Sequence, residues 1–288
     1  MRLFLQYAAS GLATGCAFAL VATGFVAIYR VTRVVNFAQG VFAVLAGMMA
    51  YTLLAIGVPH FVAEALAVVA AVVAGALVGF VAIGRRGTSP LASLIITLGL
   101  GIGSYALLIL LWGDQPISFD GLKGNLDVGG VGMQVQYLLV VALTAVAFVA
   151  LGLFFDHTYL GRGLTACSSN PRAARLVGID VRRMGLVAFG LGGGLGGLAG
   201  VLLTPLQPVS FNSDVGIAIS GFAAAIFGGL LRPGAALVGG LVLGVAEALV
   251  AGYGQASLQS GVALVIMLGI MIYRAGRRPL VAADQDAA

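Results

Sequence analysis

Apolar positions in this chain form long blocks that are separated by short polar and charged interruptions. A helix that crosses a bilayer needs about 20 mostly apolar residues, and nine blocks come close to that length. They cover residues 5–29, 34–56, 61–83, 90–112, 137–155, 184–206, 215–231, 235–252 and 258–273. The last three blocks are short, so one of them could be a half-helix or a re-entrant segment. The pattern therefore predicts a polytopic helical bundle with eight or nine transmembrane helices.

Composition supports a bundle that is surrounded by lipid. The chain has 288 residues, of which 60% are hydrophobic and only 9% are charged, whereas soluble domains carry about 25% charged residues. So little polar surface cannot cover a soluble globule, and lipid must cover it instead. The 44 glycines indicate close helix contacts, because small residues let helix backbones approach one another in a membrane. We predict an all-α integral membrane protein with a single domain over residues 1–288.

The arginines predict an orientation, because Lys and Arg are retained on the cytoplasmic side of a membrane. With nine crossings, one set of alternate connections holds Arg30, Arg33, Arg85, Arg86, Arg162, Arg172, Arg175, Arg182, Arg183, Arg232, Arg274, Arg277 and Arg278. The other set holds only Lys123 between the crossings. Arg2 is the one basic residue that this orientation places on the external side. The C-terminus and the polar loop 156–183 are thus predicted to be cytoplasmic and the N-terminus external. Scattered charges of this kind, at a net +5, do not indicate nucleic-acid binding.

Two polar interruptions resemble each other. Val35-Asn36-Phe37 and Phe211-Asn212 are 176 residues apart, and each follows a Gly-rich apolar block and precedes another. In the predicted orientation they lie on opposite sides of the membrane. Residues 5–112 and 184–275 are therefore candidates for inverted-topology repeats, with 137–155 as the connector and one or more discontinuous helices at the interruptions. The alternative is that two Gly-rich halves look alike through composition alone.

The polar loop 156–183 contains a readable helix. Asn170 can cap it, Pro171 suits the first helical position, and Gly178 suits the left-handed position after the last turn. The helical period places Ala173, Ala174 and Val177 on one face and Arg172 and Arg175 on another. A helix of two turns is marginal alone in water. It must either pack against the inner surface of this protein or dock into a groove on a cytoplasmic partner.

A few polar side chains lie in or beside the apolar blocks. A charge at bilayer depth costs about 2.5–3.5 kcal/mol on insertion scales, so an ionisable residue there should face a partner or a wet cavity. Glu247 is the main candidate for a pathway or gating residue, and an interhelical structural contact is the alternative. The complete set of pathway candidates is Asn36, Gln39, Ser93, Thr97, Asn212, Ser220 and Glu247.

The sequence offers no catalytic, cofactor-binding or metal site. Lys123 is its sole lysine, so the chain lacks the phosphate-binding loop that ATP hydrolysis requires. His60 and His157 have no ligand spacing around them, and neither do Cys16 and Cys167. We predict that the chain is not an enzyme and that energy for transport comes from a partner or an ion gradient.

Three motifs resemble those of a known family. Gly161-Arg162-Gly163-Leu164-Thr165-Ala166-Cys167, followed by Ala173-Ala174-Arg175-Leu176-Val177-Gly178-Ile179, resembles the cytoplasmic loop of ABC-type branched-chain amino acid permeases, the high-affinity Leu/Ile/Val uptake family. Asn36-Phe37-Ala38-Gln39-Gly40 is similar to that family's Asn-Phe-Ala-His-Gly motif, with Gln39 where His is common. The third motif comprises Leu198-Ala199-Gly200-Val201-Leu202, Phe227-Gly228-Gly229, Pro233-Gly234-Ala235, Gly239-Gly240 and Glu247. Leu231-Arg232 departs from the family's usual Gly-Ser, and the resemblance extends over about residues 5–275.

The resemblance implies the permease subunit of an ATP-driven importer in the bacterial plasma (inner) membrane, with branched-chain or related amino acids as the cargo. It also implies a homologous second permease subunit, an external solute-binding protein and two cytoplasmic subunits that hold ATP and Mg²⁺. The coupling helix that contacts those ATP-binding subunits would comprise Arg172, Ala173, Ala174, Arg175, Leu176, Val177 and Gly178. Similar permeases carry urea or short amides, and an ion-coupled secondary transporter of small polar solutes is the alternative from another mechanism.

Overall fold

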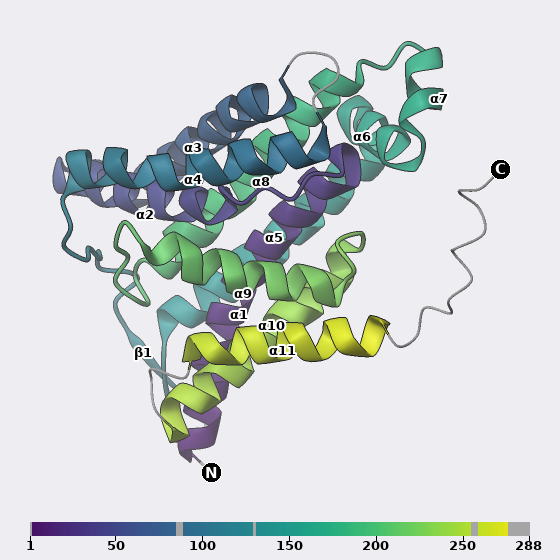
Figure 1. Cartoon of the computed structure of the whole chain (residues 1–288). Helices are drawn as coiled ribbons and strands as arrows, with labels where there is room; N and C mark the ends of the chain where they lie inside the picture. The colour runs from purple at the N-terminus through teal and green to yellow at the C-terminus, as the bar shows by residue number, and fades with distance from the viewer. Residues whose placement is uncertain (1, 85–88, 129–130, 255–258, 276–288) are drawn as a thin grey trace.

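The computed structural model describes residues 2–84, 89–128, 131–254 and 259–275, and most of them are helical (Figure 1). The helices are α1 (Arg2–Thr32), α2 (Gln39–Ala55), α3 (His60–Ile83), α4 (Pro90–Trp112), α5 (Val135–His157), α6 (Tyr159–Ser169), α7 (Pro171–Leu176), α8 (Val181–Leu203), α9 (Ser213–Phe227), α10 (Pro233–Tyr253) and α11 (Gln259–Ala275). Two short strands, β1 (Asn125–Val128) and β2 (Val131–Gln134), pair in an antiparallel hairpin. Within the described residues, this hairpin corrects the prediction of an all-α chain.

Six of the helices are long and apolar enough to cross a membrane, namely α1, α3, α4, α5, α8 and α10. Three other apolar helices, α2, α9 and α11, are shorter. With 17 and 15 residues, α2 and α9 are about 25 and 22 Å long at 1.5 Å per residue, less than the hydrocarbon core of about 30 Å. Each predicted apolar block overlaps one of these nine helices. However, α2 begins five residues inside the block 34–56, and α9 ends four residues before the end of the block 215–231.

The bundle is built around α1, which packs against α10, α8, α9 and α5. On one side α3 packs along α8, and α2 lies against both of them. The hairpin lies near the N-terminal end of α1, where the Gln6 side chain donates a hydrogen bond to the Gly132 carbonyl. The short helices α6 and α7 lie at the opposite end of the bundle (Figure 1). The long connection before α5 and the polar loop after it are therefore at opposite ends.

Glycines set the contact between α1 and α10. A Cβ added at Gly240 would lie 2.6 Å from the backbone nitrogen of Ala19, and one added at Gly15 would lie 2.7 Å from the Gly240 carbonyl oxygen. The two backbones thus meet without side chains between them. This is the close approach that small residues permit, and it supplies the van der Waals contact that holds helices together in lipid.

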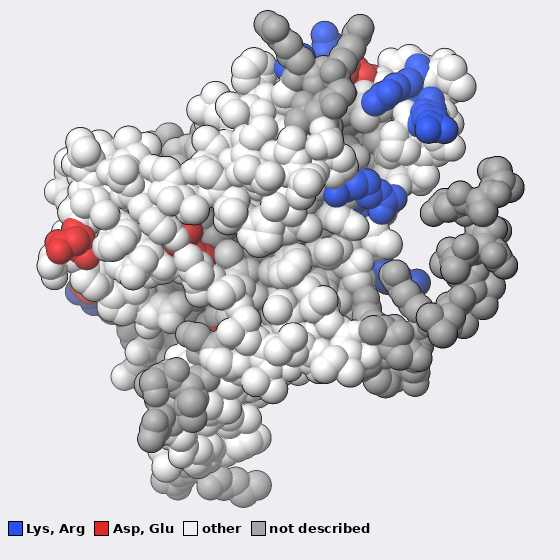
Figure 2. Space-filling model, in the orientation of Figure 1, with Lys and Arg blue, Asp and Glu red and all other residues white. Residues whose placement is uncertain are grey.

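Basic side chains gather on the part of the surface that carries α6 and α7, while the long helical walls are mostly uncharged (Figure 2). Arg33 belongs to this basic surface, and its side chain donates a hydrogen bond to the Ser168 carbonyl at the end of α6. Four arginines used to predict the orientation, Arg85, Arg86, Arg277 and Arg278, lie outside the described residues.

Candidate functional site

The chain turns back into the bundle after α1. Arg33 takes a left-handed backbone conformation with φ of 58°, and residues 33–36 are not helical. When α2 begins at Gln39, the side-chain amide of Gln39 donates a 2.8 Å hydrogen bond to the carbonyl of Gly192. Because Gly192 is at the centre of α8, α2 begins inside the bundle instead of at its end. The first polar interruption is therefore a non-helical break between α1 and α2 that lies within the bundle.

The polar side chains at this break pair with its backbone. Oδ1 of Asn36 accepts a 3.1 Å hydrogen bond from the amide of Ala38, and the Asn36 side chain also reaches Oε1 of Gln39 at 3.4 Å. The amide of Phe37 donates to Oγ1 of Thr97 at 3.3 Å. Asn36, Gln39 and Thr97 are fully buried. They pair with backbone groups that have no helical partner, and non-helical backbone inside a membrane protein has to be shielded in this way.

Ser93 is near this break but has a different partner. Its hydroxyl donates a 2.7 Å hydrogen bond to the carbonyl of Ala82, and it is buried at 4% exposure. The bond ties the start of α4 to the end of α3. The described contacts of Ser93 are thus those of an interhelical link, and its role in a pathway stays a prediction.

The second polar interruption also leads back into the bundle. Residues 204–212 connect α8 to α9, and Val209 pairs with Ile117 through two 2.9 Å backbone hydrogen bonds. At the start of α9, the backbone carbonyl of Asp214 lies so close to Gly40 that a Cβ at Gly40 would collide with it. The first turns of α2 and α9 therefore lie side by side, although they are far apart in the sequence.

Three predicted pathway residues lie together around a cavity of about 370 Å³ beside α9. Ser220 donates a 2.8 Å hydrogen bond to Oε1 of Glu247, and the two side chains are 5% and 2% exposed. Asn212 lines the same cavity from its exposed side and accepts a 2.6 Å hydrogen bond from the Ser210 hydroxyl. Gln259 of α11 contributes to the polar wall. The seven predicted residues thus form two groups, one at each break.

Sequence reasoning missed Asp214 and Tyr105, which line a second cavity of about 270 Å³ between α4 and α9. Asp214 is only 5% exposed, and in the part of the chain that the structure describes its Oδ1 has no hydrogen-bond partner. The sequence carries a signal for Asp214, because this acidic residue lies two positions after Asn212 and immediately before an apolar block. The apolar block that the sequence predicts begins at residue 215, so the pattern makes Asp214 a flanking residue.

The polar loop contains the predicted short helix, α7. Oδ1 of Asn170 accepts hydrogen bonds from the amides of Arg172 and Ala173, both at 3.0 Å, and Gly178 has a φ of 85°. Both ends of the predicted helix are thus confirmed. The preceding helix, α6, was not predicted.

The three apolar residues that the helical period places on one face of α7 have different surroundings in the structure. Ala174 is 3% exposed and packs beside Cys167, Leu164 and Ala188, whereas Val177 is 76% exposed. The physical reason is that this helix of six residues leans on α6 and α8, so one side is covered by the protein itself. Leu176, at 90% exposure, is the large apolar side chain on the open side.

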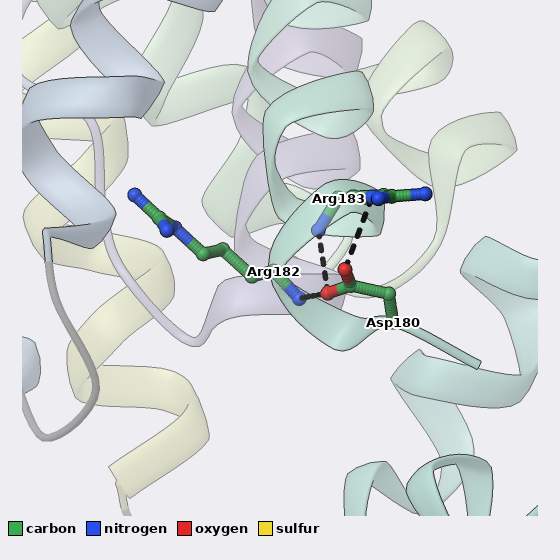
Figure 3. A network of polar contacts seen from close by, with 3 residues as sticks. All are labelled: Asp180, Arg182 and Arg183. Atoms are coloured by element: carbon green, nitrogen blue, oxygen red, sulfur yellow. Dashed lines mark hydrogen bonds and ion pairs between the residues drawn. The ribbon is translucent and has the colours of Figure 1, made fainter. Parts of the chain in front are cut away.

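Asp180 fixes the end of the loop to α8. Its Oδ1 accepts hydrogen bonds from the amides of Arg182 and Arg183 at 3.0 and 3.1 Å, and its Oδ2 forms a 3.2 Å ion pair with Nε of Arg183 (Figure 3). The guanidinium of Arg182 lies 5.6 Å from the ring centre of Phe80 on α3. An acidic cap also suits the positive end of a helix. The loop therefore ends in a capped helix start that joins it directly to α8.

Comparison with known proteins gives a consistent assignment. The model of the family described as branched-chain amino acid transport system / permease component matches residues 7–271. A probable branched-chain amino acid transport permease, LivH of Methanocaldococcus jannaschii, is 31% identical and covers 88% of this chain and 85% of that protein. The high-affinity branched-chain amino acid transport permease BraD of Pseudomonas aeruginosa is 28% identical, with 94% of both chains covered.

A solved structure supports the fold alone. A chain of the PsaBC complex from Streptococcus pneumoniae has a TM-score of 0.52 to this chain at 13% identity, with 93% of this chain and 91% of that chain covered. The helical bundle agrees with the family match, which extends over residues 7–271. This chain belongs to the branched-chain amino acid transport system permease component family.

Proposed function

We propose that this chain forms the translocation pathway of an ATP-driven importer for branched-chain or related amino acids in the bacterial plasma membrane. The observation that carries the proposal is the meeting of α2 and α9, two short helices that begin side by side within the bundle. Discontinuous helices of this kind place binding groups at membrane depth, where two halves of a transporter move against each other. The relatives that the chain resembles are named as permeases for branched-chain amino acids.

Inverted-topology repeats over residues 5–112 and 184–275 are part of the proposal. If α1 is exchanged with α8, α2 with α9, α3 with α10 and α4 with α11, the observed contacts map onto one another. The α1–α10 contact becomes α8–α3, α1–α9 becomes α8–α2, and α2–α3 becomes α9–α10. This correspondence supports a repeat more strongly than shared Gly content does. It also favours nine crossings, with residues 33–38 and 204–212 completing the crossings of α2 and α9.

Energy enters through α7 in this proposal. The chain has no phosphate-binding loop, so ATP and Mg²⁺ are bound by two cytoplasmic partner subunits. Leu176 and Val177 present apolar side chains at 90% and 76% exposure, while Arg172 and Arg175 are exposed beside them. Exposed apolar residues with flanking charge suit a groove on another protein. We place this end of the bundle in the cytosol, because basic side chains gather there (Figure 2). The C-terminus is proposed to be on the same side, as the count of nine crossings predicts.

A homologous second permease subunit and an external solute-binding protein complete the assembly. Cargo selection lies mostly with the binding protein, since a pathway that bound cargo tightly could not release it. Glu247 and Ser220 line the cavity at the second break and are proposed as pathway or gating residues.

Reconstitution tests the proposal. The chain is coexpressed with the ATP-binding and permease subunits that copurify with it, reconstituted in proteoliposomes, and supplied with external binding protein and labelled leucine. We expect uptake that requires internal ATP and persists when ionophores collapse all ion gradients. Uptake that follows a Na⁺ or H⁺ gradient without ATP would establish the ion-coupled alternative, and uptake of urea or short amides alone would reassign the cargo.

A further inference from the structure

We infer that the cavity between α4 and α9 is a transient cargo site, in which the carboxyl group of Asp214 receives the ammonium group of an aliphatic amino acid. The inference deepens the proposed function and rests on it. We call this space the α4–α9 cavity; its walls include Phe37, Leu98, Ile102, Tyr105, Asp214 and Phe222. No residue of this cavity other than Phe37 belongs to a motif that carried the family resemblance.

The walls suit a branched apolar side chain. The ring of Phe222 lies 5.5 Å from that of Phe25 and 6.5 Å from that of Phe37, measured between ring centres, and Leu98 and Ile102 face them from α4. The volume is about 270 Å³. That volume is several times the share of one water in the liquid, about 30 Å³, so the cavity has room for a small aliphatic amino acid.

Asp214 is the one charged group among the described residues that line this apolar space. It is 5% exposed, and among the described atoms its Oδ1 has no hydrogen-bond partner. Of the described residues that line the cavity, none is Lys, Arg or His. A buried carboxylate is stabilised only when it is paired and hydrogen-bonded. A primary ammonium supplies the missing positive charge and three hydrogen-bond donors. The Tyr105 side chain also contacts the Asp214 carboxyl group.

The α4–α9 cavity also lies where a pathway between two halves should lie. Phe37 belongs to the first break and is held by Thr97 of α4, while Asp214 belongs to the first turn of α9 and contacts Gly40 of α2. A shift between these elements changes the distance between the carboxyl group and the apolar walls. One ionic contact per cargo molecule gives weak binding, which release requires.

Substitution in the assembled importer tests the transport role. Asp214→Asn removes the charge with little change in shape, and we expect leucine uptake at saturating cargo to fall at least tenfold. Asp214→Glu should restore a substantial part of it. Subunit copurification and the ATPase stimulation by loaded binding protein should stay unchanged. Asp156→Asn is the matched control, because Asp156 is exposed at the end of α5; its uptake should equal that of the wild type.

Two outcomes of this assay would overturn the inference. Wild-type uptake by Asp214→Asn would show that the ammonium group does not need this carboxyl group. Loss of the second permease subunit from the purified Asp214→Asn assembly would show instead that the cavity is a seat for that subunit.

A binding assay on the purified chain separates this inference from the proposed function. Gly101 borders the cavity, and a Cβ there meets its nearest neighbour at an ordinary 3.7 Å, so Gly101→Cys introduces a thiol at the site. Millimolar leucine or 3-methylbutylamine should slow its alkylation at least threefold, and 4-methylpentanoate, which lacks the ammonium group, should not. The protection should disappear in the double variant with Asp214→Asn. Equal protection by 4-methylpentanoate would refute the ammonium contact, whatever the transport assay shows.

Discussion

The side chain of Gln39 reaches the backbone carbonyl of Gly192 across 153 residues of sequence, at 2.8 Å. This hydrogen bond joins the first turn of α2 to the centre of α8 and so fixes the depth at which α2 begins. It also keeps Oε1 of Gln39 within 3.4 Å of the Asn36 side chain. The re-entrant break thus depends on an amide that donates to one partner and accepts from another.

Gln39→Leu should therefore destabilise the protein. Leucine is similar in size but leaves the Asn36 amide and the Gly192 carbonyl without their partner, and a buried polar group that loses its partner costs about 1–3 kcal/mol. We expect a lower midpoint of thermal unfolding in detergent, with Gln39→His, which keeps a donor and an acceptor, closer to the wild type. Equal midpoints for Gln39→Leu and the wild type would contradict the role of this bond.

The α1–α10 contact should not tolerate a side chain at Gly240. Gly240→Val places its Cβ 2.6 Å from the backbone nitrogen of Ala19, so the helices must separate, and overpacking of this kind typically costs about 1–3 kcal/mol. We expect less folded protein in the membrane and a lower unfolding midpoint. Gly99→Val is the control, since a Cβ at Gly99 has no neighbour within 4 Å. Similar losses for both variants would mean that valine itself, and not the contact, is responsible.

Leu176, the exposed large apolar residue of α7, should be needed to recruit the ATP-binding subunits. Leu176→Asp places a charge where an apolar groove is expected to close over a 90% exposed side chain, and copurification of those subunits should fall at least tenfold. Leu122→Asp, at a 45% exposed position near the hairpin, should leave copurification unchanged. Undiminished recruitment by Leu176→Asp would remove α7 from the docking surface.

Local signals in the sequence were sufficient for the helix after Asn170, because its cap, its first proline and Gly178 act within a few residues. They were insufficient for α6, whose Gly161 and Gly163 have low helix propensity. Those glycines are present because a Cβ at Gly163 would lie 2.9 Å from the sulfur of Met184, and one at Gly161 would meet the backbone of Phe154. Such tertiary contacts cannot be read from one sequence.

The same distinction applies to the candidate site. Asn36 and Gln39 were predicted because a polar break in an apolar block must be shielded, and both are fully buried. Asp214 was missed because its depth depends on how far residues 204–212 return into the bundle. The hairpin was missed because its strands of four residues are too short to show an alternating pattern.

The sidedness of α7 tests the central claim, that power for transport enters from the cytosol through this helix. Val177→Cys, at 76% exposure, and Lys123→Cys, in the loop before the hairpin, provide thiols at opposite ends of the bundle. The native Cys16 and Cys167 are 4% and 0% exposed, and burial raises the pKa of the Cys167 thiol, so neither should react with a membrane-impermeant maleimide. In intact cells that express this chain without its partner subunits, the account predicts labelling of the cysteine at position 123 and none at 177 until the membrane is permeabilised. Labelling at position 177 in intact cells would contradict it.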